Sequence, residues 1–337
     1  MKRKGRGANR VGAGSISSLA GARKGFWLCR ETGIPERRQL RRIQTGRSVP
    51  QTLTEVYSLD LPDVQRVPVV FASPHSGADY PAAFLSGTAL DRRAIRSSED
   101  AFVDRLYASA PDCGAPLLAA RVPRAFVDLN RAADELDPAV IDGIARSAHN
   151  PRISSGLGVI PRVVAGGRTI YTGKLTQAEA ETRLRRYWHP YHDRLRRLLE
   201  QTRESFGEAV LIDCHSMPHE AIESHARPGQ PRPEVVLGDR FGAAAGRDVV
   251  DRIEAAFATA GLRVARNAPF AGAYITQAYG RPSRRTHVVQ VEIDRALYMD
   301  EARIEPSADF PGFCTLIAGV VAEICGSFSQ DMPLAAE

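Results

Sequence analysis

Apolar residues along the chain gather in short continuous runs that end on polar residues. The clearest example is Val210–Pro218, where Val210, Leu211 and Ile212 run directly into Asp213-Cys214-His215-Ser216. A continuous apolar run without alternation is typical of a strand buried in a parallel sheet, and ligands bind at the carboxyl edge of such sheets. The pattern therefore predicts a central strand that presents His215 at its end, with Asp213 on the same face.

Similar runs elsewhere predict the other elements. Strands are expected in four further segments: 67–72, 116–122, 233–238 and 286–293. Helices are expected in the second half of 89–110 and over 176–204, 247–260 and 310–328. Strands that alternate with helices indicate an α/β fold with a mixed, largely parallel central sheet.

Two helix starts carry capping signals. Thr176 and Glu179 form a capping box at the start of the long helix over 176–204, which Pro190 is expected to end or kink. Before the apolar residues of 102–107, Glu99 and Asp100 stand where they could cap a helix and favour its positive end.

The last strand contains a carboxylate. Alternation over 286–293 places His287, Val289, Val291 and Ile293 on one face and Glu292 on the other. A glutamate inside an apolar strand is unfavourable unless it has a partner or a chemical role. An ion pair and a catalytic role are equally compatible with this position.

Charge is distributed unevenly over the 337 residues. The net charge is +6, but residues 1–48 hold thirteen Lys and Arg and two Glu, so the remaining residues carry −5. We therefore expect a disordered basic leader over 1–50, a folded domain over 51–330 and a tail over 331–337.

No apolar run is expected to span a bilayer, and no nucleic-acid-binding motif is present. The five cysteines, odd in number and without a C-x-x-C pair, favour a reducing, cytoplasmic setting.

The predicted strand ends and loops bring reactive side chains together. Strand ends supply His75, His215 and Glu292, a helix start supplies Glu99 and Asp100, and a loop supplies Asn130 and Arg131. Two histidines and one carboxylate with an open fourth position are typical of a catalytic zinc site, in which a separate carboxylate acts as general base. Glu292 can take that role, although no H-E-x-x-H helix is present and the spacing alone leaves other α/β enzymes open.

A series of motifs in this order resembles the N-formylglutamate amidohydrolase family. The motifs lie between 67 and 301 and comprise Ser73-Pro74-His75-Ser76-Gly77, Glu99-Asp100 with Val103-Asp104-Arg105-Leu106, Asp128-Leu129-Asn130-Arg131, Gly156-x-Gly158-x-Ile160, Tyr191-His192, Asp213-Cys214-His215-Ser216-Met217 and Gln290-Val291-Glu292-Ile293. The resemblance implies a single three-layer α/β domain that is phosphorylase/hydrolase-like, related to zinc carboxypeptidases and to the aspartoacylase and succinylglutamate desuccinylase group.

The resemblance also implies roles for individual residues. His75, Asp100 and His215 would hold the metal, with Glu99 as the alternative carboxylate and Asp79 as a weaker third. The related desuccinylases have a glutamate where this chain has Ala78, so the carboxylate is the least secure ligand. The remaining roles are general base for Glu292, oxyanion stabilisation for Arg124, a substrate-carboxylate clamp for Asn130 and Arg131, and orientation of a ligand for Asp213.

The expected reaction is metal-dependent hydrolysis of an anionic N-acyl amino acid, foremost N-formyl-L-glutamate to formate and L-glutamate, as in histidine catabolism. Zinc is the expected metal, although Mn, Fe or Co would suit the same ligands. Another N-acyl amino acid hydrolase or a carboxypeptidase-like enzyme is the alternative, and a nucleic-acid-binding protein acting through the leader is a remote one. The oligomeric state stays open.

Overall fold

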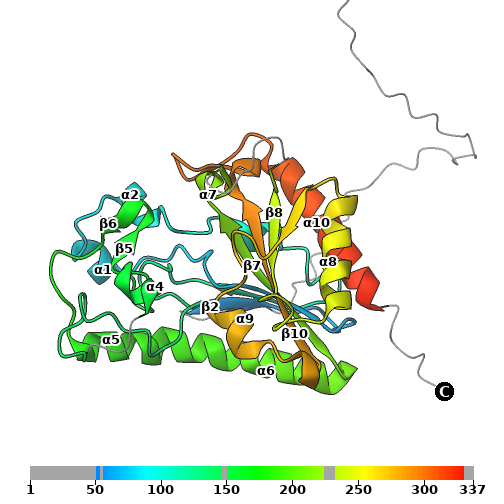
Figure 1. The fold of residues 1–337 in the computed structure, drawn as a ribbon, viewed down its shortest axis with the longest axis horizontal. Coiled ribbons are helices and arrows are strands. Elements are labelled where there is room, and N and C mark those ends of the chain that lie inside the picture. The colour runs from blue at the N-terminus through cyan, green and yellow to red at the C-terminus, as the bar shows by residue number, and fades with distance from the viewer. Residues whose placement is uncertain (1–50, 54–55, 146–149, 224–231, 330–337) are drawn as a thin grey trace, which may run out of the picture. The chain divides into compact units, whose positions relative to one another are not determined.

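Eight strands form one mixed sheet, in the order β1-β2-β4-β3-β7-β10-β8-β9 (Figure 1). The computed structural model describes residues 51–53, 56–145, 150–223 and 232–329. The strands of this sheet are β1 (Gln51–Leu53), β2 (Tyr57–Asp60), β3 (Val69–Ser73), β4 (Leu117–Ala120), β7 (Ala209–Met217), β8 (Val235–Gly238), β9 (Val264–Arg266) and β10 (Thr286–Asp294).

The centre of the sheet is parallel. Strands β4, β3, β7 and β10 run in the same direction, and β9 is parallel to β8, whereas the pairs β1–β2, β2–β4 and β10–β8 are antiparallel. All nine residues of β7 are buried, as its continuous apolar run predicts. The expected mixed, largely parallel α/β sheet is therefore confirmed.

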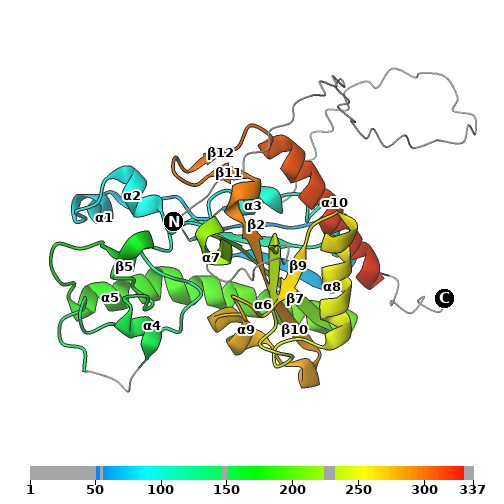
Figure 2. The same cartoon turned by 45° about the horizontal axis from the view of Figure 1, so that its top comes forward.

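Helices cover both faces of the sheet and make three layers (Figures 1 and 2). On one face, α3 (Val103–Leu106), α8 (Arg247–Thr259) and α10 (Phe310–Ser329) pack against residues such as Val210, Ile212 and Val289. On the other face, α6 (His189–Phe206) and α9 (Tyr274–Tyr279) pack against Leu211 and Val288. The two cores follow the alternation of the strands, so the face assigned to Glu292 from sequence is the face that it occupies.

Short elements form a group to one side of the sheet, at the left in Figure 1. They are α1 (Ala82–Ser86), α2 (Arg92–Arg96), α4 (Pro151–Ser154), α5 (Gln177–Arg183) and the hairpin of β5 (Val163–Val164) and β6 (Arg168–Thr169). Along the chain, α7 (His219–Glu223) follows β7, and the strand pair β11 (Met299–Asp300) and β12 (Glu305–Pro306) follows β10. The side group supplies one wall of the cavity described below.

The chain over 89–110 departs from the expected helix. It forms only α2 and α3, because Phe102 takes a left-handed φ of 67° and α3 has no side-chain cap. The backbone N–H of Asp100 instead donates to the carbonyl of His75 at 3.1 Å. Glu99 and Asp100 are both buried, so the capping role considered for them is wrong.

The helix over 176–204 is confirmed with one refinement. The capping box of Thr176 and Glu179 opens α5, a π-helical turn over Leu184–Trp188 follows, and α6 continues to Phe206. Pro190 is the second residue of α6, and the wider turn before it accommodates the missing N–H, so the proline does not end the helix. Strands β2 and β9 and helix α9 were not expected from sequence.

Helix α10 is more apolar than the sequence analysis recognised. Among the described residues it is the one helix long and apolar enough, by length and composition, to cross a membrane. Its large apolar side chains, among them Phe313, Ile317 and Ile324, are buried in the core, while Gly312 and Gly319 face outward. One face of α10 thus packs on the core of the domain, and 39% of its apolar window is buried.

The described residues belong to the unit Arg47–Glu337. The leader expected over 1–50 and the tail expected over 331–337 lie outside the described residues.

Candidate active site

The carboxyl ends of the central strands bring the predicted side chains together. His75 follows β3, His215 lies near the end of β7, and Glu292 stands opposite His215 in the register of β7 and β10. Asp100 reaches the same place through its backbone bond to His75. Residues that are far apart in the sequence therefore meet at one edge of the sheet.

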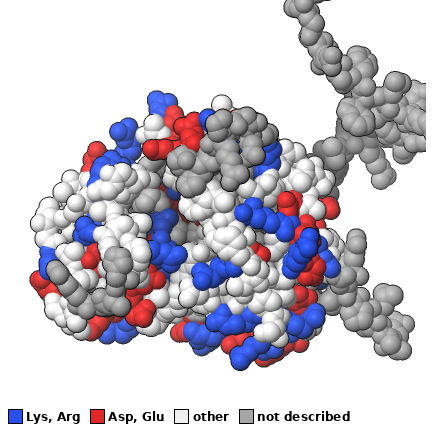
Figure 3. All heavy atoms as spheres, viewed as in Figure 1, with Lys and Arg blue, Asp and Glu red and all other residues white. Residues whose placement is uncertain are grey.

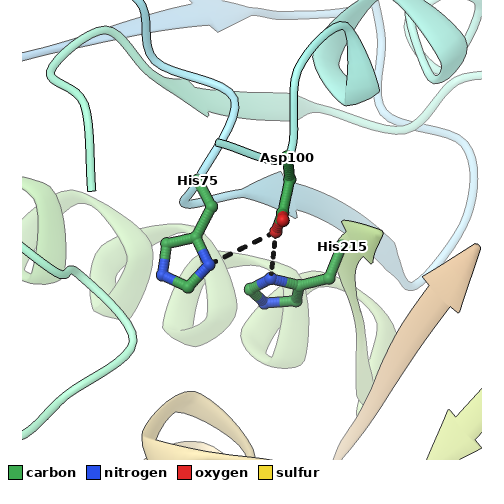
Figure 4. Close-up of side chains that lie close together, drawn as sticks. All are labelled: His75, Asp100 and His215. Atoms are coloured by element: carbon green, nitrogen blue, oxygen red, sulfur yellow. Dashed lines mark hydrogen bonds and ion pairs between the residues drawn. The ribbon is translucent and has the colours of Figure 1, made fainter. Parts of the chain in front are cut away.

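His75, Asp100 and His215 converge on a single point (Figure 4). The Nδ1 atoms of His215 and His75 lie 2.9 and 3.3 Å from Oδ2 of Asp100, and the three candidate ligand atoms lie within 4.8 Å of one another. All three residues are buried. The structure thus brings the expected carboxylate, Asp100, to the two histidines.

The donor set fits a metal ion. Nδ1 of His75 is buried and has no partner in hydrogen-bonding geometry among the described residues, although it faces Asp100. The opposite nitrogen of each ring faces a carboxylate: His75 Nε2 is hydrogen-bonded to Asp128 Oδ1 at 2.7 Å, and His215 Nε2 lies 3.2 Å from Asp213 Oδ1 at ion-pair distance. Carboxylates hold metal-binding histidines in this way and leave the other ring nitrogen for the metal.

Electrostatics in the metal-free protein also favour a cation here. Burial opposes a charged imidazole, yet Asp213 and Asp100 raise the pKa of His215 well above its ordinary value. Burial likewise opposes a charged carboxylate, yet the hydrogen bond with His215 and the nearby ring of His75 hold the pKa of Asp100 well below its usual range. A proton on a histidine thus supplies the positive charge that a metal ion would otherwise supply.

Glu292 lies beside this cluster. It is buried, and Gln290 Nε2 donates to its Oε1 at 2.7 Å. Burial raises the pKa of Glu292 to about 7, an effect that the positive charge of His215 moderates and the carboxylate of Asp100 reinforces. A carboxyl group with a pKa near neutrality is suited to proton transfer.

The cluster lines a cavity of about 670 Å³. A hollow is visible on the face drawn in Figure 3, with basic side chains at its edge. Four arginines line the cavity: Arg124, Arg131, Arg152 and Arg295. A cavity of this size and charge suits a small anionic ligand.

Arg124 stands next to the candidate metal ligands. Its Nη2 donates to Asp128 Oδ2 at 3.0 Å, and its Nη1 lies 4.0 Å from Asp100 Oδ1. Although burial opposes the charge, these two carboxylates raise the pKa of Arg124. It therefore carries a fixed positive charge beside the cluster.

Asn130 and Arg131 differ in how much of each side chain is free. Asn130 Oδ1 accepts from the N–H of Ile275, and its amide nitrogen lies 3.0 Å from His215 Nε2 and 3.3 Å from Asp213 Oδ2. Arg131 donates Nε and Nη1 to the carbonyls of Leu157 and Asn130. Asn130 is thus committed to the protein, whereas Nη2 of Arg131 has no such bond among the described residues.

Helix α6 and the π-helical turn before it fix the loop that carries these two residues. Trp188 Nε1 donates to the carbonyl of Arg131 at 2.9 Å, and His192 Nε2 donates to the carbonyl of Leu129 at 2.9 Å. His192 and Tyr191, which form one of the motifs of the family resemblance, are both fully buried. The packing of α6 therefore determines where the loop 128–131 lies.

The alternative carboxylates lie elsewhere. Glu99 is buried against Arg96 and Tyr80, and Asp79 forms an exposed ion pair with Arg121.

Sequence reasoning also missed two groups that hold the cluster. Asp128 belongs to a quoted motif but received no role, and Arg295 donates to Asp100 Oδ1 at 2.8 Å. Arg295 directly follows β10, and that position at a strand end was its only signal.

The sequence pattern of the N-formylglutamate amidohydrolase family matches residues 67–299. The chain belongs to this family. Two curated relatives are similar to it: N-formylglutamate deformylase of Pseudomonas aeruginosa, 33% identical over 240 residues, and that of Pseudomonas putida, 31% identical over 239. The alignments cover 70% of this chain in both cases and 84% and 83% of the relatives. As a member of the family, the chain is an amidohydrolase.

Solved structures agree with the family and the fold. The N-formylglutamate amidohydrolase of Ralstonia eutropha JMP134 is 35% identical, with a TM-score of 0.77 over 82% of this chain and 99% of that one. A gene product of Agrobacterium tumefaciens, 18% identical with a TM-score of 0.56 over 82% of this chain and 95% of that one, shares the fold. The α/β architecture is therefore that of the amidohydrolase family.

Proposed function

We propose that this amidohydrolase cleaves N-formyl-L-glutamate to formate and L-glutamate and needs a divalent metal ion, zinc in the first place. One observation carries the proposal: the Nδ1 atoms of His75 and His215 and Oδ2 of Asp100 converge within 4.8 Å, in the cavity of a chain whose relatives are named N-formylglutamate deformylase. A metal held by these residues would polarise a carbonyl oxygen and lower the pKa of a water molecule.

Glu292 is the proposed proton carrier. Its carboxylate lines the cavity beside the metal-binding cluster, and its pKa of about 7 lets it both take up and release a proton near neutral pH. In the proposed reaction it accepts the proton of the attacking water. It then returns a proton to the nitrogen of the departing amino acid.

The arginines have separate proposed roles. Arg124, whose charge is held by Asp128 and Asp100, would stabilise the negative charge that develops on the formyl oxygen. Arg131 would bind the α-carboxylate through its free Nη2. Because the amide of Asn130 is engaged with Ile275, His215 and Asp213, its proposed role is to position the cluster rather than to hold the substrate.

Two broader expectations stay proposals. A place in the breakdown of histidine follows from the proposed substrate. A reducing, cytoplasmic location is supported by the four cysteines among the described residues, which are free thiols.

Formate release from N-formyl-L-glutamate tests the function. Wild type and His215→Ala are assayed after chelation and after zinc is added back. Zinc-dependent release that is absent in His215→Ala supports both the reaction and the site. Full activity in chelator would contradict the metal, and zinc binding without formate release would direct the search to N-acetyl and N-succinyl amino acids.

A further inference from the structure

Two of the four arginines around the cavity have no carboxylate partner. Arg124 pairs with Asp128 at 3.0 Å, and Arg295 pairs with Asp100 at 2.8 Å. Within the part of the chain that the structure describes, neither Arg131 nor Arg152 forms an ion pair with a carboxylate, although both line the cavity. Neither guanidinium group is thus paired directly with a carboxylate of the described residues, although Asp128 attracts Arg131 from a greater distance.

The guanidinium group of Arg152 also has no hydrogen bond within the described residues. Its backbone N–H is capped by Asn150 Oδ1 at 2.9 Å, which fixes the start of α4 but leaves the side chain free. The side chain is half-buried in the cavity wall. An arginine held partly away from water without a bonding partner is poised to bind an anion.

Arg152 and Arg131 lie on neighbouring segments. Nε of Arg131 donates at 3.0 Å to the carbonyl of Leu157, five residues after Arg152. Burial is the main cause that lowers the pKa of Arg131; the carboxylate of Asp128 opposes this shift, and repulsion by Arg124 and Arg152 adds to it. Because two nearby cations repel one another, a ligand that brings two negative charges would relieve this unfavourable arrangement.

We propose that Arg152 binds the side-chain carboxylate of the substrate while Arg131 binds the α-carboxylate, so that Arg152 selects N-acyl derivatives of acidic amino acids. This inference rests on the proposed function and adds a residue that determines specificity. The β5–β6 hairpin, which lines the same cavity, also leaves room for a ligand, because no atom lies within 4 Å of a Cβ placed on Gly166 or Gly167.

The experiment compares two substrates of the same shape, N-formyl-L-glutamate and N-formyl-L-glutamine, with wild type, Arg152→Gln and Arg168→Gln. Arg168 is a matched control: it is exposed on β6, donates to the carbonyl of Ala165 and does not line the cavity. Thermal unfolding checks the fold of each variant. Arg152→Gln should fold normally, because its side chain makes no bond among the described residues.

Arg152→Gln should lower kcat/KM for formylglutamate by about 10- to 100-fold, mainly through KM, since a hydrogen-bonded ion pair with the substrate is lost. Its kcat/KM for formylglutamine should change far less, and Arg168→Gln should behave as wild type. Equal losses on both substrates, or no loss on either, would overturn the role of Arg152.

If the proposed function is wrong, the assay gives a result that differs from a failure of the role of Arg152. In that case wild type releases no formate from either compound. Calorimetric titration with N-acetyl-L-glutamate and N-acetyl-L-glutamine then makes the same comparison through binding alone. Tighter binding of the acidic ligand that disappears in Arg152→Gln would support the inference, and equal affinities in wild type would refute it.

Discussion

Oδ1 of Asp128 lies 2.7 Å from Nε2 of His75, on the side of the ring opposite the atom that faces Asp100. The same oxygen accepts the N–H of Asn130 at 2.8 Å, and Oδ2 accepts from Arg124. Asp128 therefore joins a candidate metal ligand to the loop of Asn130 and Arg131. Although burial opposes its charge, His75, Arg124 and Arg131 hold the pKa of Asp128 well below its usual range.

Asp128→Asn should weaken zinc binding by about 10- to 100-fold, because a neutral amide holds the His75 ring less firmly and makes it a poorer ligand. Competition with a chromogenic chelator measures the affinity. Asp79→Asn, in an exposed ion pair with Arg121, is the control and should bind zinc as wild type does. Unchanged affinity in Asp128→Asn would show that Asp128 does not support the metal.

Glu292 and Gln290 give a prediction about pH. Glu292 must be deprotonated to accept a proton, so kcat/KM should rise with pH through its pKa. Burial raises that pKa to about 7 in the metal-free protein, and the hydrogen bond from Gln290 lowers it. A bound cation would lower it further, so the rise should lie below pH 7 in the loaded enzyme.

Gln290→Met removes the donor to Glu292 and should move this rise to higher pH by about one unit, the equivalent of one hydrogen bond to a charged group. The pH profile of kcat/KM measures the shift. Gln277→Met, exposed on α9, should leave the profile in place. A pH profile that stays unmoved in Gln290→Met would exclude Glu292 as the titrating group.

Glu292→Gln should lower kcat by about 10²- to 10⁴-fold and still bind zinc.

Hydrophobic patterning was sufficient to place His75, His215 and Glu292 at one sheet edge. Continuous apolar runs identify parallel strands, and parallel strands share a carboxyl edge, so side chains at their ends meet. The alternation in β10 likewise assigned Glu292 to the correct face. These inferences are local, and each depends on one segment alone.

Asp100 and Arg295 could not be placed in that way. Local sequence around Asp100 suggested a helix cap, but the left-handed turn at Phe102 and the bond to the carbonyl of His75 direct its side chain inward. Both features depend on tertiary contacts. The contact of Arg295 with Asp100 forms only when the fold brings the end of β10 next to the turn that carries Asp100. The proposed role of Asp100 as a metal ligand came from the family resemblance and not from local propensity.

Gly77 shows how tightly the loop after β3 is packed. A Cβ at this position would lie 2.1 Å from the backbone carbonyl oxygen of Val122, which cannot move without shifting the chain that follows β4. Gly77→Ala should therefore destabilise the fold by about 1–3 kcal/mol, as overpacked sites do, and displace His75. Urea unfolding and zinc affinity measure the two effects.

Gly173→Ala is the matched control for Gly77→Ala. No atom lies within 4 Å of a Cβ built there, and its φ is not left-handed. Its free energy of unfolding should stay within about 0.5 kcal/mol of wild type, as for most surface changes. If both variants unfold alike, the close approach of Gly77 to Val122 does not constrain the loop.

His192 provides the last prediction, on stability below neutral pH. It is buried between Tyr279, whose hydroxyl lies 2.8 Å from Nδ1, and the carbonyl of Leu129, which accepts from Nε2. Burial lowers the pKa of His192 to about 3, although the bond to Leu129 opposes this. The unfolded chain therefore binds a proton below about pH 6.5 that the folded chain does not accept.

Since the folded-state pKa of His192 is lowered, its contribution to stability is complete above pH 6.5 and is lost as pH falls toward 3, by about 1.4 kcal/mol per pH unit. His192→Gln keeps an amide donor for Leu129 but does not titrate. Urea unfolding of the metal-free protein at pH 7 and pH 5 should thus show a smaller acid-induced loss in His192→Gln, by about 2 kcal/mol. His189→Gln, at a site that is more than a third exposed, should lose as much as wild type. An equal loss in His192→Gln would mean that other groups, such as the carboxylates around His75, account for the acid sensitivity.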